Sequence, residues 1–189
     1  MRFLNRLRIF VTVIILIVFG IIMIKKNIEG NKIVTYTFWD KTFTVDSPAK
    51  YREVNDSELL YDDSSLEITN DEGSTQFAFS VYKLNDEEGA QQETAKDLNE
   101  LIYKDFEGSN LYAMKDRSSK KIGDTDVYGF ESVMVKNPQQ NIENDIYMYI
   151  YHFEKDGYII GVQAFSAAIS ESKLAGEAEK LIGTVKLVK

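Results

Sequence analysis

The single histidine of this 189-residue sequence, His152, is the first candidate for catalysis, because a neutral imidazole can act as a general base or a metal ligand. It follows Ile146, Met148 and Ile150 on the same side of an extended run, where a hydrogen-bonded structural histidine is expected. A Ser-His-Asp hydrolase also needs a strained nucleophile turn such as G-x-S-x-G, and the sequence has none. It has no glycine-rich phosphate loop either. We therefore expect no catalytic residue and a protein that is not an enzyme.

Acidic residues gather in short groups that could offer oxygen ligands to a hard cation such as Ca²⁺. The groups are Asp62-Asp63, Asp71-Glu72, Asp86-Glu87-Glu88 and Asp124/Asp126. Asp124-Thr125-Asp126 resembles a fragment of a calcium loop, but the glycine and the terminal glutamate of an EF-hand are missing. Cysteine is absent, which excludes a thiolate zinc site and a cysteine nucleophile. We expect solvated turns, no metal and no cofactor, and keep as the alternative a hydrolase or metal-binding protein whose carboxylates converge only on folding.

Two further sets of residues could bind a partner or ligand. Tyrosine combines apolar area with a polar tip, as glycan or peptide recognition requires, and four tyrosines are candidates: Tyr147, Tyr149, Tyr151 and Tyr158. A basic patch could dock an acidic partner or lipid head groups, and four residues form it: Lys115, Arg117, Lys120 and Lys121. Core packing under a helix is the more common explanation for such a row of tyrosines, and an exposed strand edge protected by lysines is the more common explanation for the patch.

The charge distribution excludes nucleic acid as a partner. The net charge of the chain is −8, yet the first 32 residues hold six basic groups against Glu29 alone. Residues 33–189 therefore hold the remaining 16 basic and 29 acidic residues, a net charge of −13. A domain this acidic is repelled by a phosphate backbone.

Residues 9–24 contain no charge and predict a transmembrane anchor. Arg8, Lys25 and Lys26 can snorkel to the interfaces, and residues 21–26 offer no small-x-small cleavage site, so we expect the anchor to stay uncleaved. The expected order is a short basic cytoplasmic tail (1–8), the anchor (9–24), a linker (25–32) and one soluble domain (33–189). A long acidic domain can be translocated largely regardless of its charge, so we expect it outside the cytoplasm, on a single-pass protein of the cell membrane.

Hydrophobic periodicity within the domain predicts strands, a helix, more strands and a final helix. Strands are expected at residues 34–39, 43–45, 59–61, 66–69, 77–84, 111–115, 127–135, 146–153 and 158–165. Helices are expected at residues 90–106 and after Ser170. The inward residues of the first are Ala95, Leu98, Leu101, Ile102 and Phe106, and those of the second are Leu174, Ala178, Leu181 and Ile182. Tight turns are expected at Asp40-Lys41 and Asp156-Gly157.

This order indicates an α+β fold built on an antiparallel sheet. Residues 146–153 are apolar or aromatic on both sides, so this strand should lie at the centre of the sheet with helices on both faces. Tyr149 should then be buried beneath the helix at 90–106, and Lys120 should lie on an exposed turn.

From residue 43 onward the layout resembles the PsbP-like family, which has the Mog1/PsbP-like fold. The resemblance rests on a strand ending in a proline turn (FTVDSP, 43–48), the segment IGDTDVYGFE (122–131), the long hairpin at 146–165 and the closing GTVKL (183–187). It implies an α/β/α sandwich, with no family catalytic residues, and bacterial members are often membrane-tethered or exported. We therefore expect a membrane-tethered, extracytoplasmic, non-enzymatic domain that binds or helps assemble an envelope protein or a small ligand.

Overall fold

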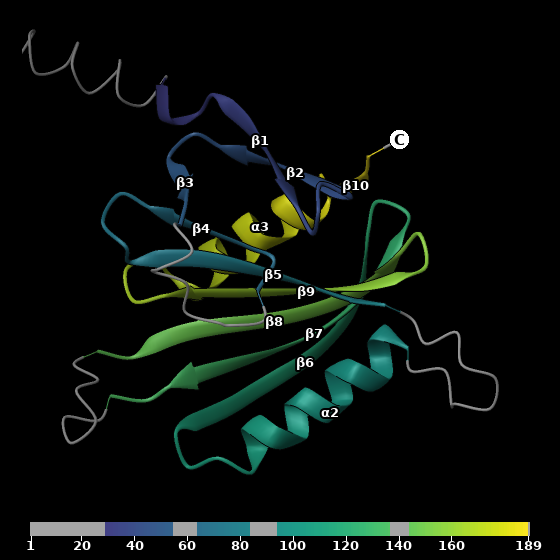
Figure 1. Cartoon of the computed structure of the whole chain (residues 1–189). Coiled ribbons are helices and arrows are strands. Elements are labelled where there is room, and N and C mark those ends of the chain that lie inside the picture. Colours follow the sequence, from purple (N-terminus) through teal and green to yellow (C-terminus); the bar gives the residue numbers. More distant parts are fainter. Residues whose placement is uncertain (1–28, 55–63, 84–93, 137–143, 189) are drawn as a thin grey trace, which may run out of the picture.

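The computed structural model describes residues 29–54, 64–83, 94–136 and 144–188. Within these ranges the chain forms two antiparallel sheets and two helices (Figure 1). The expected anchor at 9–24 and the expected strand at 59–61 lie outside the described residues. No helix within the described ranges has the length and apolar character needed to cross a bilayer.

A seven-stranded antiparallel sheet is the centre of the fold, with the strand order β3-β4-β5-β9-β8-β7-β6. Its strands are β3 (Tyr51–Glu53), β4 (Leu66–Asn70), β5 (Thr75–Lys83), β6 (Tyr112–Ile122), β7 (Thr125–Met134), β8 (Ile146–Lys155) and β9 (Tyr158–Ser166). The β8–β9 hairpin turns at Asp156-Gly157, both with positive φ, as the sequence predicts. β6 is longer than expected, so Lys120 lies within this edge strand rather than on a turn.

A separate three-stranded sheet corrects the expectation of a single sheet. It consists of β1 (Ile33–Phe38), β2 (Phe43–Pro48) and β10 (Lys186–Leu187). β1 and β2 are joined by the expected tight turn, in which Trp39, Asp40 and Lys41 all have positive φ. Phe38, Phe43 and Val45 are buried, so this small sheet turns an apolar face to the main core.

One helix covers each face of the large sheet, as expected (Figure 1). α3 (Glu171–Ile182) packs beside the small sheet, and it buries the four residues that the sequence predicts: Leu174, Ala178, Leu181 and Ile182. α2 (Ala95–Glu107) covers the opposite face and is capped at its C-terminal end by Gly108. Its first turn is fixed by a capping box between Thr94 and Asp97, a local signal that favours this start over residue 90.

The buried stripe of α2 matches the expected one only in part. Ala95 is buried as expected, but Asn99 is buried as well, whereas Leu101 is 53% exposed. Ile102 and Phe106 pack inward, as expected. In this orientation of the helix, the side-chain amide of Asn99 donates a buried hydrogen bond to Nδ1 of His152 on β8.

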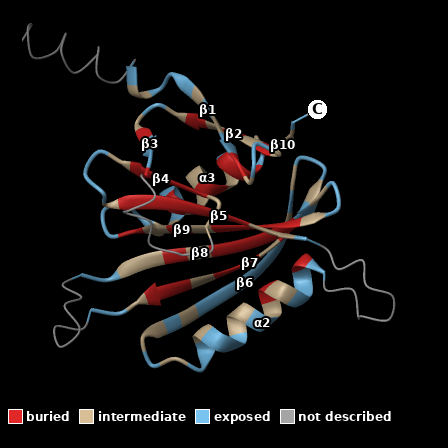
Figure 2. Ribbon diagram, in the orientation of Figure 1, coloured by how far each residue is buried: buried red, intermediate tan, exposed pale blue. Residues whose placement is uncertain are grey.

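β8 is covered on both faces, as its composition predicts. Met148 and Ile150 pack toward α2, whereas Tyr151 and Phe153 pack toward α3. The middle strand is nevertheless β9, with β8 one place to its side. Figure 2 shows the buried residues concentrated along β5, β8 and β9.

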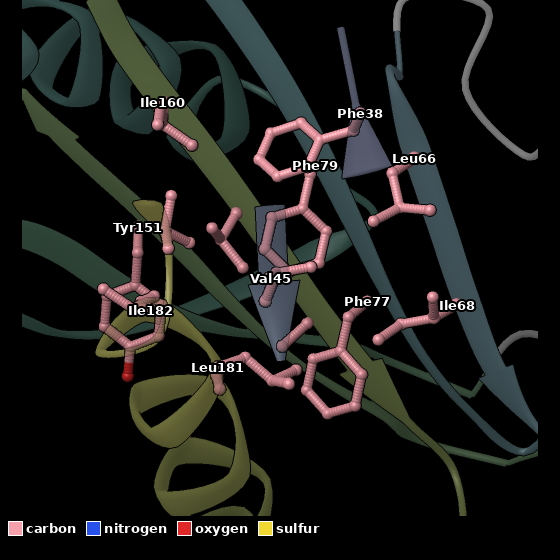
Figure 3. Close-up of a cluster of buried hydrophobic side chains, with 14 of the residues drawn as sticks. Phe38, Val45, Leu66, Ile68, Phe77, Phe79, Tyr151, Ile160, Leu181 and Ile182 are labelled. Atoms are coloured by element: carbon pink, nitrogen blue, oxygen red, sulfur yellow. The ribbon is translucent and has the colours of Figure 1, made fainter. Parts of the chain in front are cut away.

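The main hydrophobic core lies between the large sheet on one side and α3 with the small sheet on the other. Figure 3 shows its aromatic and aliphatic side chains gathered from both sheets and from α3, among them Phe38, Phe77, Phe79, Tyr151 and Leu181. This core fixes the position of α3 against β8, and that position determines which tyrosines reach the surface.

Candidate binding site

The face of β6–β8 that lies beside α3 brings together five of the eight binding candidates. A β-bulge in β6 places Lys115 and Asp116 opposite the single residue Glu131 of β7. Tyr147 and Tyr149 extend from the same face of β8. We call this surface the tyrosine face and define it by eight residues: Lys115, Lys120, Glu131, Tyr147, Tyr149, Tyr151, Glu171 and Glu179.

Lys115 links three elements of the tyrosine face. Its Nζ lies 3.2 Å from Oε1 of Glu131 and also pairs with Glu171 of α3. The same ammonium lies 5.5 Å from the ring centroid of Tyr147, within the range of a cation–π interaction. Lys115 and Tyr147, both candidates for binding from the sequence, therefore form one cluster together with two carboxylates.

Lys120 forms a second contact between the edge strand and α3. Its ammonium pairs with Glu179 and lies 5.1 Å from the ring centroid of Tyr151. Tyr151 itself is fully buried in the main core, and its ring lies over Gly129 of the neighbouring strand. A methyl group at position 129 would lie 2.4 Å from Cδ1 of Tyr151, so only glycine fits there.

Tyr149 lies between these two contacts and is half-buried. Burial and the neighbouring carboxylate of Glu131, to which its hydroxyl donates a hydrogen bond, raise the pKa of the phenol, so it stays protonated. The expectation that the helix at 90–106 covers Tyr149 is wrong. Residues alternate across a strand, and the side of β8 that carries Tyr149 turns toward α3.

The other three candidates lie away from the tyrosine face. Tyr158 packs against Trp39 and Phe43, with ring centroids 4.6 and 5.6 Å away. Arg117 lies on the α2 face, with Cζ 3.6 Å from the ring centroid of Tyr103 and Nη1 2.8 Å from Glu100. Lys121 pairs with Asp126 at 3.2 Å. All four basic candidates thus have carboxylate partners within the domain.

His152 occupies a structural position rather than an open site. It is 2% exposed, and its Nδ1 accepts a hydrogen bond of 2.9 Å from the side-chain amide of Asn99. Nε2 would lie 3.3 Å from a methyl group at position 161, so the ring packs closely over Gly161. Burial lowers the pKa of the imidazole to about 4.

The acidic groups do not form a metal centre in the described part of the chain. Within it, no three His, Asp or Glu side chains lie close enough to hold a metal ion. Asp71 and Glu72 are exposed in a turn, whereas Asp62-Asp63 and Asp86-Glu87-Glu88 lie outside the described residues. Asp124 and Asp126 line an open pocket of about 400 Å³ at the hairpin turns.

The carboxylates of the tyrosine face are the residues that the sequence does not single out. Glu131, Glu171 and Glu179 come from β7 and α3, and each meets a lysine of β6. The only local sign is that Glu131 interrupts an otherwise apolar alternation. The bulge that brings Lys115 to this face has no sequence signal.

The sequence matches no protein family and no curated protein. Solved structures do resemble the fold. PsbP (CyanoP) of Synechocystis has a TM-score of 0.58 at 8% identity, over 84% of this chain and 94% of that one. The Ran-binding protein Mog1p of Saccharomyces cerevisiae has a TM-score of 0.52 at 8% identity, over 83% and 96%.

Two bacterial structures extend the likeness. LpqN of Mycobacterium tuberculosis, described as involved in cell envelope biogenesis, has a TM-score of 0.54 at 10% identity, over 84% of this chain and 91% of that one. A Bacteroides thetaiotaomicron protein has a TM-score of 0.53 at 15% identity over 85% of this chain, which spans about half (49%) of that protein. The domain has the Mog1/PsbP-like fold, as the sequence resemblance implies.

Proposed function

We propose that this Mog1/PsbP-like domain is a non-enzymatic binding module, tethered to the membrane by residues 9–24 and lying outside the cytoplasm. Its partner on this proposal is a protein of the cell envelope, bound on the tyrosine face. Two neighbours of the fold support a protein partner and an envelope role, since one is named a Ran-binding protein and another is described as involved in cell envelope biogenesis.

The observation that carries the proposal is the composition of the tyrosine face. Tyr147 and Tyr149 are half-exposed, and tyrosines of this kind are enriched among the residues that dominate protein interfaces. Lys115 and Lys120 are already paired with carboxylates, so the tyrosine face does not strongly attract either a cationic or an anionic ligand. The paired lysines and carboxylates around these tyrosines offer both donors and acceptors in fixed positions. Such a surface is complementary to another protein rather than to a polyanion.

A photo-crosslinking amino acid at position 147 tests the tyrosine face in intact cells. We expect a covalent adduct with one discrete envelope protein, because a partner bound on this face lies within reach of the probe. The matched control carries the same probe at Leu101, which is 53% exposed on the opposite face of the domain. Adducts of the same proteins in the same yield from both positions would contradict the proposed face.

The tether has its own test. Membranes from cells that express the full chain are washed with sodium carbonate, which strips peripheral proteins. We expect the protein in the pellet, because an uncleaved apolar helix inserts in effect irreversibly. A mature N-terminus mapped by mass spectrometry to residues 25–40 would contradict it.

A further inference from the structure

A pocket of about 430 Å³ opens between the small sheet and the C-terminal half of α3, away from the tyrosine face. Its apolar lining comes from Ile33, Pro48 and Leu181. Small-molecule sites typically range over about 300–1,000 Å³ and combine an apolar lining with a few placed polar groups. The pocket has the size and composition of such a site.

The two carboxylates in the pocket wall are neutralised by the domain itself. Glu177 accepts hydrogen bonds from Nζ of Lys50, at 2.7 Å, and from the hydroxyl of Tyr51. Burial, together with the neighbouring Glu177, raises the pKa of Tyr51, so this phenol stays a neutral donor.

Asp46, the other carboxylate, is similarly satisfied. It accepts a hydrogen bond of 2.6 Å from Thr35 and lies 3.7 Å from Nζ of Lys186. Both negative charges in the wall thus have a positive partner within reach, and neither is left to attract a cationic ligand.

Lys180 also lines the pocket, and its charge takes no part in the ion pairs of Glu177 and Asp46. It is exposed and makes no ion pair with any residue in the described part of the chain. It lies in the last turn of α3, where a cation also stabilises the helix dipole. That role accounts for a lysine at the end of the helix, but the same ammonium also gives the pocket a single positive group beside an apolar wall.

We propose that this pocket binds a small amphipathic anion, an apolar chain that carries one carboxylate or phosphate group. The anionic group lies at Lys180, and the chain lies against Ile33, Pro48 and Leu181. The neutral Lys50–Glu177–Tyr51 group closes the wall and disfavours a cationic amphiphile, because no carboxylate is left unpaired.

The position of the pocket is compatible with two sources for such a ligand, a membrane lipid and a free fatty anion. The backbone N–H of Lys50 donates to the carbonyl of Gly30 at 3.0 Å, so the N-terminal end of the described chain lies beside the pocket. Five residues then separate Gly30 from the expected anchor, a reach of roughly 18 Å at most. If the proposed tether holds, a membrane lipid as well as a free fatty anion can reach the pocket.

The experiment uses the full chain in phosphatidylcholine nanodiscs, with the substitution Lys32→Cys labelled by an environment-sensitive fluorophore. The sequence has no cysteine, so the label is unique, and Lys32 is exposed beside Ile33 without lining the pocket, so the label leaves the pocket wall intact. Sodium octanoate should shift the emission saturably, whereas octylammonium, of equal chain length and opposite charge, should not. Lys180→Gln should weaken octanoate binding roughly tenfold or more, because a charge-assisted contact is lost.

Lys173→Gln is the matched control, since this lysine is exposed on the same helix and does not line the pocket. It should leave octanoate binding unchanged. If the source is a membrane lipid, nanodiscs that contain phosphatidylglycerol should shift the emission without octanoate. If the source is a free anion, phosphatidylglycerol should leave the emission unchanged while octanoate shifts it. Either result supports the pocket. The proposal is overturned if neither octanoate nor phosphatidylglycerol shifts the emission, if octylammonium matches octanoate, or if Lys180→Gln and Lys173→Gln behave alike. A response to octanoate does not depend on the tyrosine face, so the two binding proposals fail separately.

Discussion

Truncation of Tyr151 to alanine should lower the free energy of unfolding by about 3–5 kcal/mol, a large share of the ~5–15 kcal/mol typical of a domain. Tyr151 is 1% exposed and belongs to the main core, where Figure 3 shows it among Ile160, Ile182 and Leu181. Its removal leaves a cavity that Gly129 cannot fill, because that residue has no side chain. Urea denaturation followed by the fluorescence of Trp39, the single tryptophan, measures the effect.

Two variants serve as controls for Tyr151→Ala. Tyr151→Phe keeps the ring over Gly129 and should lose much less stability than the alanine variant. Lys121→Ala removes a side chain that is 66% exposed, together with a surface ion pair worth about 0–1 kcal/mol. A Tyr151→Ala protein that unfolds at the same urea concentration as the wild type would contradict a structural role. If that protein also lost its partner, the ring of Tyr151 would contribute to recognition and not to packing.

Local alternation explains why much of the fold can be predicted from the sequence. The two apolar sides of residues 146–153 correctly indicate a strand covered on both faces, and Asp156-Gly157 correctly marks its hairpin. Periodicity says which residues share a face, but it does not say which helix covers that face. The error at Tyr149 is of this kind, because the choice between α2 and α3 depends on packing across the whole sheet.

Long-range pairing limits the prediction of the candidate site. Lys115 and Glu171 are 56 residues apart in sequence and meet only because α3 lies against the sheet beside a bulge in β6. The lysine-rich segment does form an edge strand, one of the two interpretations of the basic patch. Local pattern does not predict the pocket at Lys180 either, since its walls come from β1, β2, β3 and α3.

The buried pair of Asn99 and His152 shows a different limit. Asparagine has low helix propensity and is usually exposed, so the apolar pattern favours Leu101 as the inward residue. A buried imidazole needs a hydrogen-bond partner, and Asn99 supplies it. The cost of burying two polar groups is offset only when they meet, so neither residue alone predicts the other.

The stability of the domain should depend on His152 as the pH falls from about 6.5 to about 4. Burial lowers the pKa of the folded imidazole from 6.5 to about 4, so between these values the unfolded chain binds a proton that the folded chain does not. The contribution of His152 is therefore complete above pH ~6.5 and is lost progressively as the pH falls toward ~4. A shift of this size corresponds to roughly 3 kcal/mol, at about 1.4 kcal/mol per pKa unit.

His152→Gln separates this effect from the carboxylates that also titrate in the acidic range. Glutamine does not titrate, and its amide oxygen can still accept the hydrogen bond from Asn99. At pH 7 the variant should be less stable than the wild type, because the ring no longer packs over Gly161. Between pH 7 and pH 4 the wild type should lose roughly 3 kcal/mol more stability than the variant, as urea denaturation at each pH would show. Parallel curves of unfolding free energy against pH would mean that His152 binds its proton equally well in the folded and unfolded states. The imidazole would then have to be accessible to solvent, where it could take part in binding.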